Sequence, residues 1–249
     1  MKPSFVHYEN PTLALLFSPE SADNAIEIMN QGIEQGAEGF CIQTEALRVE
    51  DRNPETYKKI FAAAGQRPIY VTNYRHHSNE NASDEEIAEG LLELARCGAT
   101  TCDIMGDLFD RQPGEMTTDP GAVEKQKKLV EELHAAGAEV LMSSHVLKYT
   151  PAEQVLEIAL HQQERGVDIV KIVTGAETME QQLENLRITD LLKKELKVPF
   201  LFLSGGECRL HRRVGPMLGC CMYLCSLNGS DAIQPNLRHA RAYRENYPW

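Results

Sequence analysis

The feature that most constrains the fold is a regular alternation of strand-like and helix-like stretches along all 249 residues. Short apolar runs of the kind found in buried parallel strands are each followed by a helical pattern. The predicted strands are residues 12–17, 38–43, 68–73, 100–105, 138–143, 167–173, 199–203 and 220–225. The predicted helices are 21–35, 54–64, 84–97, 119–136, 151–165, 178–196, a short helix ending near 218, and 235–246.

Four of the predicted helices end in the same way. Gly36, Gly98, Gly137 and Gly166 each stand just before a strand, where a glycine can take the left-handed backbone that ends a helix. Eight such units in a chain of this length predict an α/β protein, a (β/α)8 TIM barrel with one domain over residues 1–249. The Gly-x-Gly-x-x-Gly fingerprint is absent, so an open dinucleotide-binding sheet has little support.

The composition limits the partners and the compartment. A net charge of −12 argues against nucleic acid and against an anionic membrane surface as partners. The sequence contains no apolar run near the roughly 18 residues of a spanning helix and no signal-peptide pattern at its start, so a cytoplasmic protein is predicted. Five of the seven cysteines lie in strand-like apolar runs and are interpreted as buried free thiols, namely Cys41, Cys102, Cys220, Cys221 and Cys225. The cysteine spacing does not suit a zinc site. No metal or cofactor is predicted.

Lys171 is the first candidate catalytic residue, because it stands in the otherwise apolar strand 167–173. Strand alternation puts it on the same side as Ile169 and Val173. If that side faces the barrel axis, desolvation disfavours the ammonium and favours a neutral amine, which can attack a carbonyl carbon to form an imine. The alternative is a structural lysine paired with a carboxylate or pointing outward.

His145 is the second candidate. It follows the strand 138–143 and lies one βα unit before Lys171. The carboxyl ends of neighbouring parallel strands lie side by side, at the face where barrel enzymes carry their sites. An imidazole there is suited to proton transfer, although a loop histidine is commonly a solvated surface residue.

The two motifs that contain these residues resemble the type I 3-dehydroquinate dehydratases. Residues 143–151, SSHVLKYTP, are similar to that family's Ser-x-His-Asp-Phe-x-x-Thr-Pro, and residues 166–173, GVDIVKIV, to its Gly-Ala-Asp-Ile-Val-Lys-Ile. The resemblance implies that Lys171 is the Schiff-base nucleophile and His145 the general acid and base. It further implies that Arg212 binds a substrate carboxylate, and, more loosely, that Gln234 binds the substrate.

The sequence departs from the family pattern in three strands. The family's Glu-x-Arg-x-Asp aligns with Cys41 to Glu45, so Gln43 replaces the arginine. The Thr-x-Arg end of the third strand is matched with a slip of one residue, which makes Arg75 a substrate-binding candidate beside His76 and His77. The family's glutamate on the fourth strand aligns near Met105. A site that binds substrate hydroxyl groups loses much of its specificity when its buried hydrogen-bonding partners change. The resemblance therefore predicts the type of reaction more firmly than the identity of the substrate.

The resemblance implies a carbon–oxygen lyase that dehydrates 3-dehydroquinate to 3-dehydroshikimate through a lysine Schiff base, in the shikimate pathway. The expected partner is a small carboxylate-bearing keto substrate, and a homodimer is expected by analogy. Two alternatives remain: a Schiff-base lyase or aldolase of the same fold that takes another keto acid, and a relative that binds a small anion without catalysis. Glu80 is a further candidate, to orient His145, and Gly205-Gly206 either approaches an anion or makes a tight turn.

Overall fold

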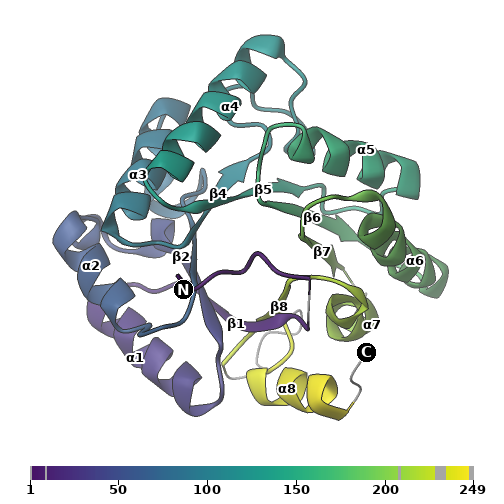
Figure 1. Cartoon of the computed structure of the whole chain (residues 1–249), viewed down its shortest axis with the longest axis horizontal. Coiled ribbons are helices and arrows are strands. Elements are labelled where there is room, and N and C mark those ends of the chain that lie inside the picture. The colour runs from purple at the N-terminus through teal and green to yellow at the C-terminus, as the bar shows by residue number, and fades with distance from the viewer. Residues whose placement is uncertain (1, 9, 207–208, 228–233, 247–249) are drawn as a thin grey trace.

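The structure is a computed structural model that describes residues 2–8, 10–206, 209–227 and 234–246. A ring of strands is surrounded by helices (Figure 1), which is the (β/α)8 TIM barrel expected from the sequence. The strands are β1 (Thr12–Phe17), β2 (Gly39–Gln43), β3 (Ile69–Thr72), β4 (Thr101–Met105), β5 (Glu139–His145), β6 (Ile169–Gly175), β7 (Phe200–Gly205) and β8 (Met222–Cys225).

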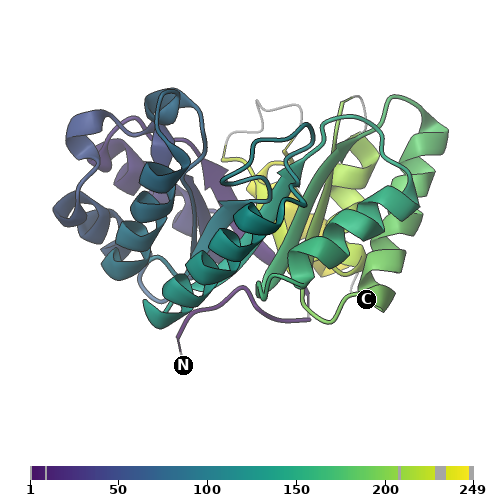
Figure 2. The ribbon, with the colours of Figure 1, turned by 90° about the horizontal axis from the view of Figure 1, so that it is seen from above.

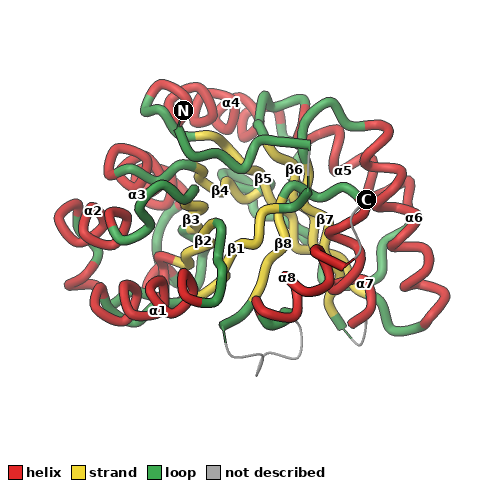
Figure 3. The backbone as a smooth tube through the Cα atoms, turned by 60° about the horizontal axis from the view of Figure 1, so that its bottom comes forward, coloured by secondary structure: helices red, strands yellow, loops and turns green. Residues whose placement is uncertain are grey.

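Helices follow the strands and cover the outside of the ring (Figure 3). The α-helices are α1 (Ala22–Glu34), α2 (Pro54–Ala62), α3 (Asp84–Cys97), α4 (Pro120–Ala135), α5 (Ala152–Gln163), α6 (Met179–Glu195), α7 (Arg209–Val214) and α8 (Leu237–Asn246). Short 3-10 helices cover Thr44–Ala46, Val49–Asp51, His77–Asn79 and Gly215–Leu218. Among the described residues, no helix combines the length and apolarity needed to span a membrane.

The strands pair in the order β7-β6-β5-β4-β3-β2-β1-β8, and every pair is parallel. β7 and β8 stand at the two ends of this order. They are linked by a backbone hydrogen bond, in which the N–H of Cys221, just before β8, donates to Phe200 O of β7 over 3.0 Å. The barrel is therefore nearly closed, and the carboxyl ends of all its strands meet at one face.

Of the four glycines expected at helix ends, Gly98 is the C-cap of α3. Gly36, Gly137 and Gly166 follow the C-cap residues of α1, α4 and α5 by one or two positions. Gly36, Gly98, Gly137 and Gly166 have φ between +84° and +113°, the left-handed region that costs a glycine no side-chain clash. The capping box expected at Ser83 is also present, with the Ser83 and Glu86 side chains each bonded to the other's backbone N–H. Local sequence therefore sets the length of these elements.

The end of β5 differs from the sequence prediction, at a candidate catalytic residue. The fifth strand was predicted to end at residue 143 and runs to His145, which is paired in register with Val173 of β6. His145 is thus a strand-end residue whose direction is fixed by the sheet, and the alternative of a solvated loop histidine is wrong. The assignment of residues 1–249 to one domain stays a prediction.

The end of the barrel opposite to this face is covered by the N-terminal segment, which crosses it before β1 (Figure 2). Phe5 is fully buried there, and a Cβ at Gly39 of β2 would come within 2.7 Å of its ring. Ser4 donates a hydrogen bond to the Glu139 carboxylate at the start of β5. The segment therefore seals the apolar interior from below.

We expect Phe5→Ala to lower the free energy of unfolding by about 3–5 kcal/mol, because it opens a cavity under the barrel. Urea denaturation followed by circular dichroism measures the loss. Val6→Ala is the matched control, since Val6 is exposed and should change the midpoint little. Equal midpoints for the two variants would contradict a sealing role for Phe5.

Candidate active site

Lys171 and His145 lie at the carboxyl end of the barrel on neighbouring strands. The register pairs Lys171 with Ser143 and His145 with Val173, so strand alternation directs all four side chains to the interior. Two cavities meet here. The inner cavity, of about 240 Å³, contains Lys171 and His145 in its wall. The outer cavity, of about 530 Å³, lies under residues 106–118 and shares His145 with the inner one.

The lysine side chain is only 6% exposed and lies in a polar cluster. Its Nζ is 2.8 Å from the hydroxyl of Tyr70, 2.8 Å from that of Tyr74 and 3.2 Å from Oδ2 of Asp103. Both tyrosine hydroxyls also donate to the same Asp103 oxygen. Lys171 thus faces the barrel axis, as the catalytic hypothesis requires, and also has the carboxylate partner of the structural alternative.

Burial and the neighbouring charge act in the same direction on the two phenols of this cluster. Burial first, and then the Asp103 charge, raise the pKa values of Tyr70 and Tyr74 well above their ordinary value. Both phenols therefore keep their protons at neutral pH, accept from the lysine and donate to the carboxylate.

The backbone on either side of the site is tied by Gln162 of α5. Its amide nitrogen donates to Lys171 O over 3.1 Å and to Ser144 Oγ over 2.9 Å. Its amide oxygen accepts from Lys171 N over 3.1 Å. Because Gln162 is completely buried, these bonds hold the ends of β5 and β6 at a fixed height relative to each other.

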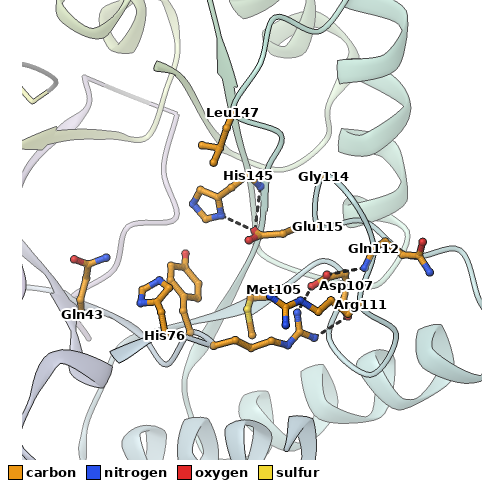
Figure 4. Close-up of a pocket in the computed structure, with 12 residues that line it drawn as sticks. Gln43, His76, Met105, Asp107, Arg111, Gln112, Gly114, Glu115, His145 and Leu147 are labelled. Carbon is orange, nitrogen blue, oxygen red and sulfur yellow. Dashed lines mark hydrogen bonds and ion pairs between the residues drawn. The ribbon is translucent and has the colours of Figure 1, made fainter. Parts of the chain in front are cut away.

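His145 is oriented by Glu115 (Figure 4). The ring Nδ1 is 2.6 Å from Glu115 Oε2, and the backbone N–H of His145 donates to the same oxygen over 3.1 Å. Burial acts to raise the pKa of the Glu115 carboxyl, but these hydrogen bonds and the charge of His145 hold it below its ordinary value. A carboxylate can only accept, so Nδ1 carries the ring proton and Nε2 is the nitrogen that can exchange protons with a ligand.

Glu115 occupies this place at a cost in backbone conformation. It has φ +52° and follows Gly114 at φ +82°, and left-handed backbone is unfavourable for a residue with a side chain. The hypothesis that Glu80 orients the ring is wrong, because Glu115 holds Nδ1 while Glu80 is exposed beyond β3. No sequence pattern singled out Glu115, since its contact depends on the path of a loop.

The predicted substrate-binding residues on the far side of the inner cavity are brought together. Arg212 of α7, Gln234 and Gln43 of β2 all line it. Arg212 is buried and its Nε donates to Ser204 O over 2.6 Å, while Gln43 accepts a hydrogen bond from Ser18. Ile233, which belongs to the loosely matched loop, lies outside the described residues.

Arg75 was expected to bind substrate, and the structure gives it other partners. Its guanidinium donates to Asp84 over 2.7 and 2.9 Å and to Asp107 over 2.7 Å. It borders the outer cavity, but its positive charge is matched by these two carboxylates. Arg75 thereby anchors the start of the 106–118 loop rather than offering a bare cation to the inner cavity.

The remaining sequence candidates do not enter the inner cavity. His76 borders the outer cavity, and Gly206 has φ +74°, in keeping with a tight turn after β7. The six cysteines within the described ranges are free and buried, as expected for five of them. Within the same ranges, no group of three or more His, Cys, Asp or Glu side chains is arranged to hold a metal ion.

The sequence did not predict the residues that surround Lys171. Asp103, Tyr70 and Tyr74 surround Lys171, yet only the polarity of Asp103 within an apolar strand could have drawn attention to it. The tyrosines resemble ordinary strand residues. Their roles depend on which face of β3 and the following loop turns inward.

The fold and the site together define a (β/α)8-barrel enzyme. The family model for type I 3-dehydroquinase matches residues 54–246. The chain therefore belongs to the type I 3-dehydroquinase family, and with it to the carbon–oxygen lyases.

Relatives support the same family. A 3-dehydroquinate dehydratase of Methanosarcina acetivorans is 23% identical over 220 residues, which covers 86% of this chain and 85% of the relative. One of Alkaliphilus oremlandii is 31% identical over 146 residues, or 57% of this chain and 53% of that protein. Among solved structures, the type I 3-dehydroquinate dehydratase of Clostridium difficile has a TM-score of 0.81 at 14% identity, covering 97% of this chain and 94% of that one. That of Geobacillus kaustophilus has a TM-score of 0.80 at 16% identity, over 98% of both chains.

We expect the contribution of Glu115 to stability to depend on pH in a defined direction. Its pKa is lowered on folding from an ordinary value of 4.5, so its stabilising effect is complete above pH 4.5 and is lost as the pH falls through the lower folded value. Urea denaturation of wild type and Glu115→Gln should therefore differ most above pH 4.5 and converge towards pH 3. Glu131→Gln, at an exposed position on α4, is the control, and a Glu115 difference that is constant with pH would contradict the assignment.

Proposed function

We propose that this chain dehydrates 3-dehydroquinate to 3-dehydroshikimate through an imine on Lys171. The observation that carries the proposal is the buried Lys171 amine, which shares the inner cavity with the Glu115-held imidazole of His145. Membership of the type I 3-dehydroquinase family and the names of the curated relatives support it. A place in the shikimate pathway, a cytoplasmic location and a homodimeric state belong to the same proposal.

The cavity suggests how the substrate lies. Its carboxylate is directed to the guanidinium of Arg212, whose planar donors suit a carboxylate. Gln234 and Gln43 contact the ring substituents from the same wall. The ketone carbon then faces Lys171, and the carbon to be deprotonated faces Nε2 of His145.

The reaction follows from these positions. The Lys171 amine adds to the ketone, and loss of water leaves a protonated imine, which makes the adjacent C–H acidic. His145 Nε2 takes that proton and an enamine forms. The enamine expels the β-hydroxyl, to which His145 returns the proton, so that water leaves. Hydrolysis of the imine releases the enone and restores Lys171. One imidazole can serve both proton transfers, removal from carbon and delivery to the leaving hydroxyl, because the two occur in sequence.

A second candidate is a Schiff-base lyase or aldolase that acts on a different keto acid. It is favoured by the wall at the second to fourth strands, where Cys41, Gln43 and Met105 replace the polar residues of the family pattern. Buried hydroxyl partners set such specificity strongly. Turnover of 3-dehydroquinate, measured as ultraviolet absorbance of the enone, separates the two candidates. The non-catalytic alternative predicts no covalent adduct with any ketone.

We expect Lys171→Ala to abolish turnover of 3-dehydroquinate and His145→Ala to lower it by about 10²–10⁴-fold, because the first loses the nucleophile and the second the proton carrier. Reduction with borohydride followed by intact mass should give an adduct in wild type and none in Lys171→Ala. Lys148→Ala, at an exposed lysine, is the control and should behave as wild type. Equal activity in Lys171→Ala and wild type would remove the proposal.

Replacing Arg212 tests the orientation of the substrate. Loss of a hydrogen bond to a charged group costs about 1.5–3 kcal/mol, so Arg212→Gln should raise KM by roughly 10- to 150-fold. Arg187→Gln is the matched control, because the Arg187 side chain is 82% exposed on α6. Steady-state kinetics provide the measurement, and an unchanged KM in Arg212→Gln would exclude this carboxylate site.

A further inference from the structure

The Tyr74 hydroxyl is in contact with the reacting nitrogen of the proposed mechanism, which so far gives it no role. It lies 2.8 Å from Lys171 Nζ, donates to Asp103 Oδ2 and is 3.2 Å from Ser143 Oγ. Its ring stands edge-on to that of His145, with centroids 5.4 Å apart. Tyr74 also borders both the inner and the outer cavity.

We propose that the Tyr74 hydroxyl, together with Asp103, is a second acid–base group of the site, which moves protons to and from the lysine nitrogen while His145 serves the substrate carbon. The inference rests on the proposed imine at Lys171. It divides the proton transfers between two separate groups, His145 with Glu115 and Tyr74 with Asp103.

Tyr74 and Asp103 together form a proton relay. Its first role is to convert the Lys171 ammonium into a neutral amine. Lys171 Nζ lies 3.2 Å from the Asp103 carboxylate, and an ammonium in that position has no electron pair with which to attack a ketone. One proton passes from Nζ to the Tyr74 oxygen as the phenolic proton passes to Asp103 Oδ2. The products are a neutral amine and a neutral carboxylic acid, and the phenol is regenerated without forming a phenolate.

The second task is the loss of water from the carbinolamine. After attack, the new C–N bond joins Lys171 to the substrate, and one amine proton moves to the former ketone oxygen. The proton held by Asp103 then returns through Tyr74 to that hydroxyl, which leaves as water as the C–O bond breaks. The protonated imine is left beside the Asp103 carboxylate, so charge and atoms balance. Hydrolysis of the product imine uses the same path in reverse.

Tyr74 fits this role better than Tyr70. Both hydroxyls contact Lys171 and Asp103, and both tyrosines line the inner cavity, but Tyr70 is completely buried, whereas Tyr74 is 6% exposed and borders the outer cavity as well. A group that delivers a proton to a departing water must touch the space where that water forms. Tyr70 lies within β3 with no exposed surface and holds the Asp103 carboxylate through its hydroxyl.

The test isolates imine formation from the later steps. In a His145→Ala background the carbon-centred proton transfer is removed, so an adduct with 3-dehydroquinate accumulates and can be trapped with borohydride at successive times. Adding Tyr74→Phe should slow its formation by about 10²–10⁴-fold, read by intact mass. Adding Tyr57→Phe instead is the matched control, since Tyr57 is a buried tyrosine of α2 outside both cavities, and should leave the rate unchanged.

The outcomes separate this inference from the proposed function. No adduct in the His145→Ala protein at any time would overturn the imine itself. An adduct that forms equally fast with and without Tyr74→Phe would overturn the relay and leave Lys171 as the nucleophile.

A second experiment tests for a purely structural role of Tyr74 without replacing it. The rate of adduct formation in His145→Ala is measured in mixtures of H2O and D2O. A relay that moves two protons predicts that this rate falls non-linearly as the deuterium fraction rises. A linear or absent dependence would also overturn the relay.

Discussion

The structure of the site depends on a pair of opposite charges placed inside an apolar barrel. Lys171 and Asp103 stand on β6 and β4, two strands apart, with their charged atoms 3.2 Å apart and almost no exposure to solvent. Such a pair is costly unless its remaining hydrogen-bonding capacity is satisfied. The hydroxyls of Tyr70 and Tyr74 do this for the lysine Nζ and for Oδ2 of Asp103, whereas Oδ1 of Asp103 has no hydrogen-bond partner among the described residues. Removing one charge would leave the other buried and unpaired, at a cost of about 3–5 kcal/mol.

A loop attached by ion pairs and hydrogen bonds covers the site. The 106–118 segment is attached at its start by Arg75, Asp84 and Asp107, and it brings Glu115 onto His145 from above. Ser144 of β5 also donates to Glu115 O over 2.6 Å. The left-handed backbone at Glu115 is thus held by contacts on both sides, so the carboxylate reaches the ring in one orientation.

The departures from the family pattern fall on one side of the cavity. Cys41, Gln43 and Met105 lie on β2 and β4, whereas the strands that carry Lys171 and His145 keep the family motifs. In the proposed function, chemistry and recognition are therefore carried by different parts of the barrel wall. This separation is a general property of a fold in which each strand end contributes its own side chain to a shared cavity.

The sequence by itself determined the barrel and identified Lys171 and His145 as the candidate catalytic residues. Helix caps such as Gly98 and Ser83 act within a few residues of their own position, and alternation along an apolar strand puts Lys171 on the same side as Ile169 and Val173. That this side faces the barrel interior was decided by the tertiary structure. The sequence did not place the end of β5 at His145, since a strand end is fixed by pairing with a neighbour. Only the tertiary structure decided that Asp103 and the tyrosines surround the amine, that Glu115 rather than Glu80 holds the imidazole, and that Arg75 is matched by two aspartates. These contacts join side chains about 10 to 100 positions apart in the chain, and such distances are set by the closure of the barrel and the path of its loops, which local pattern does not encode.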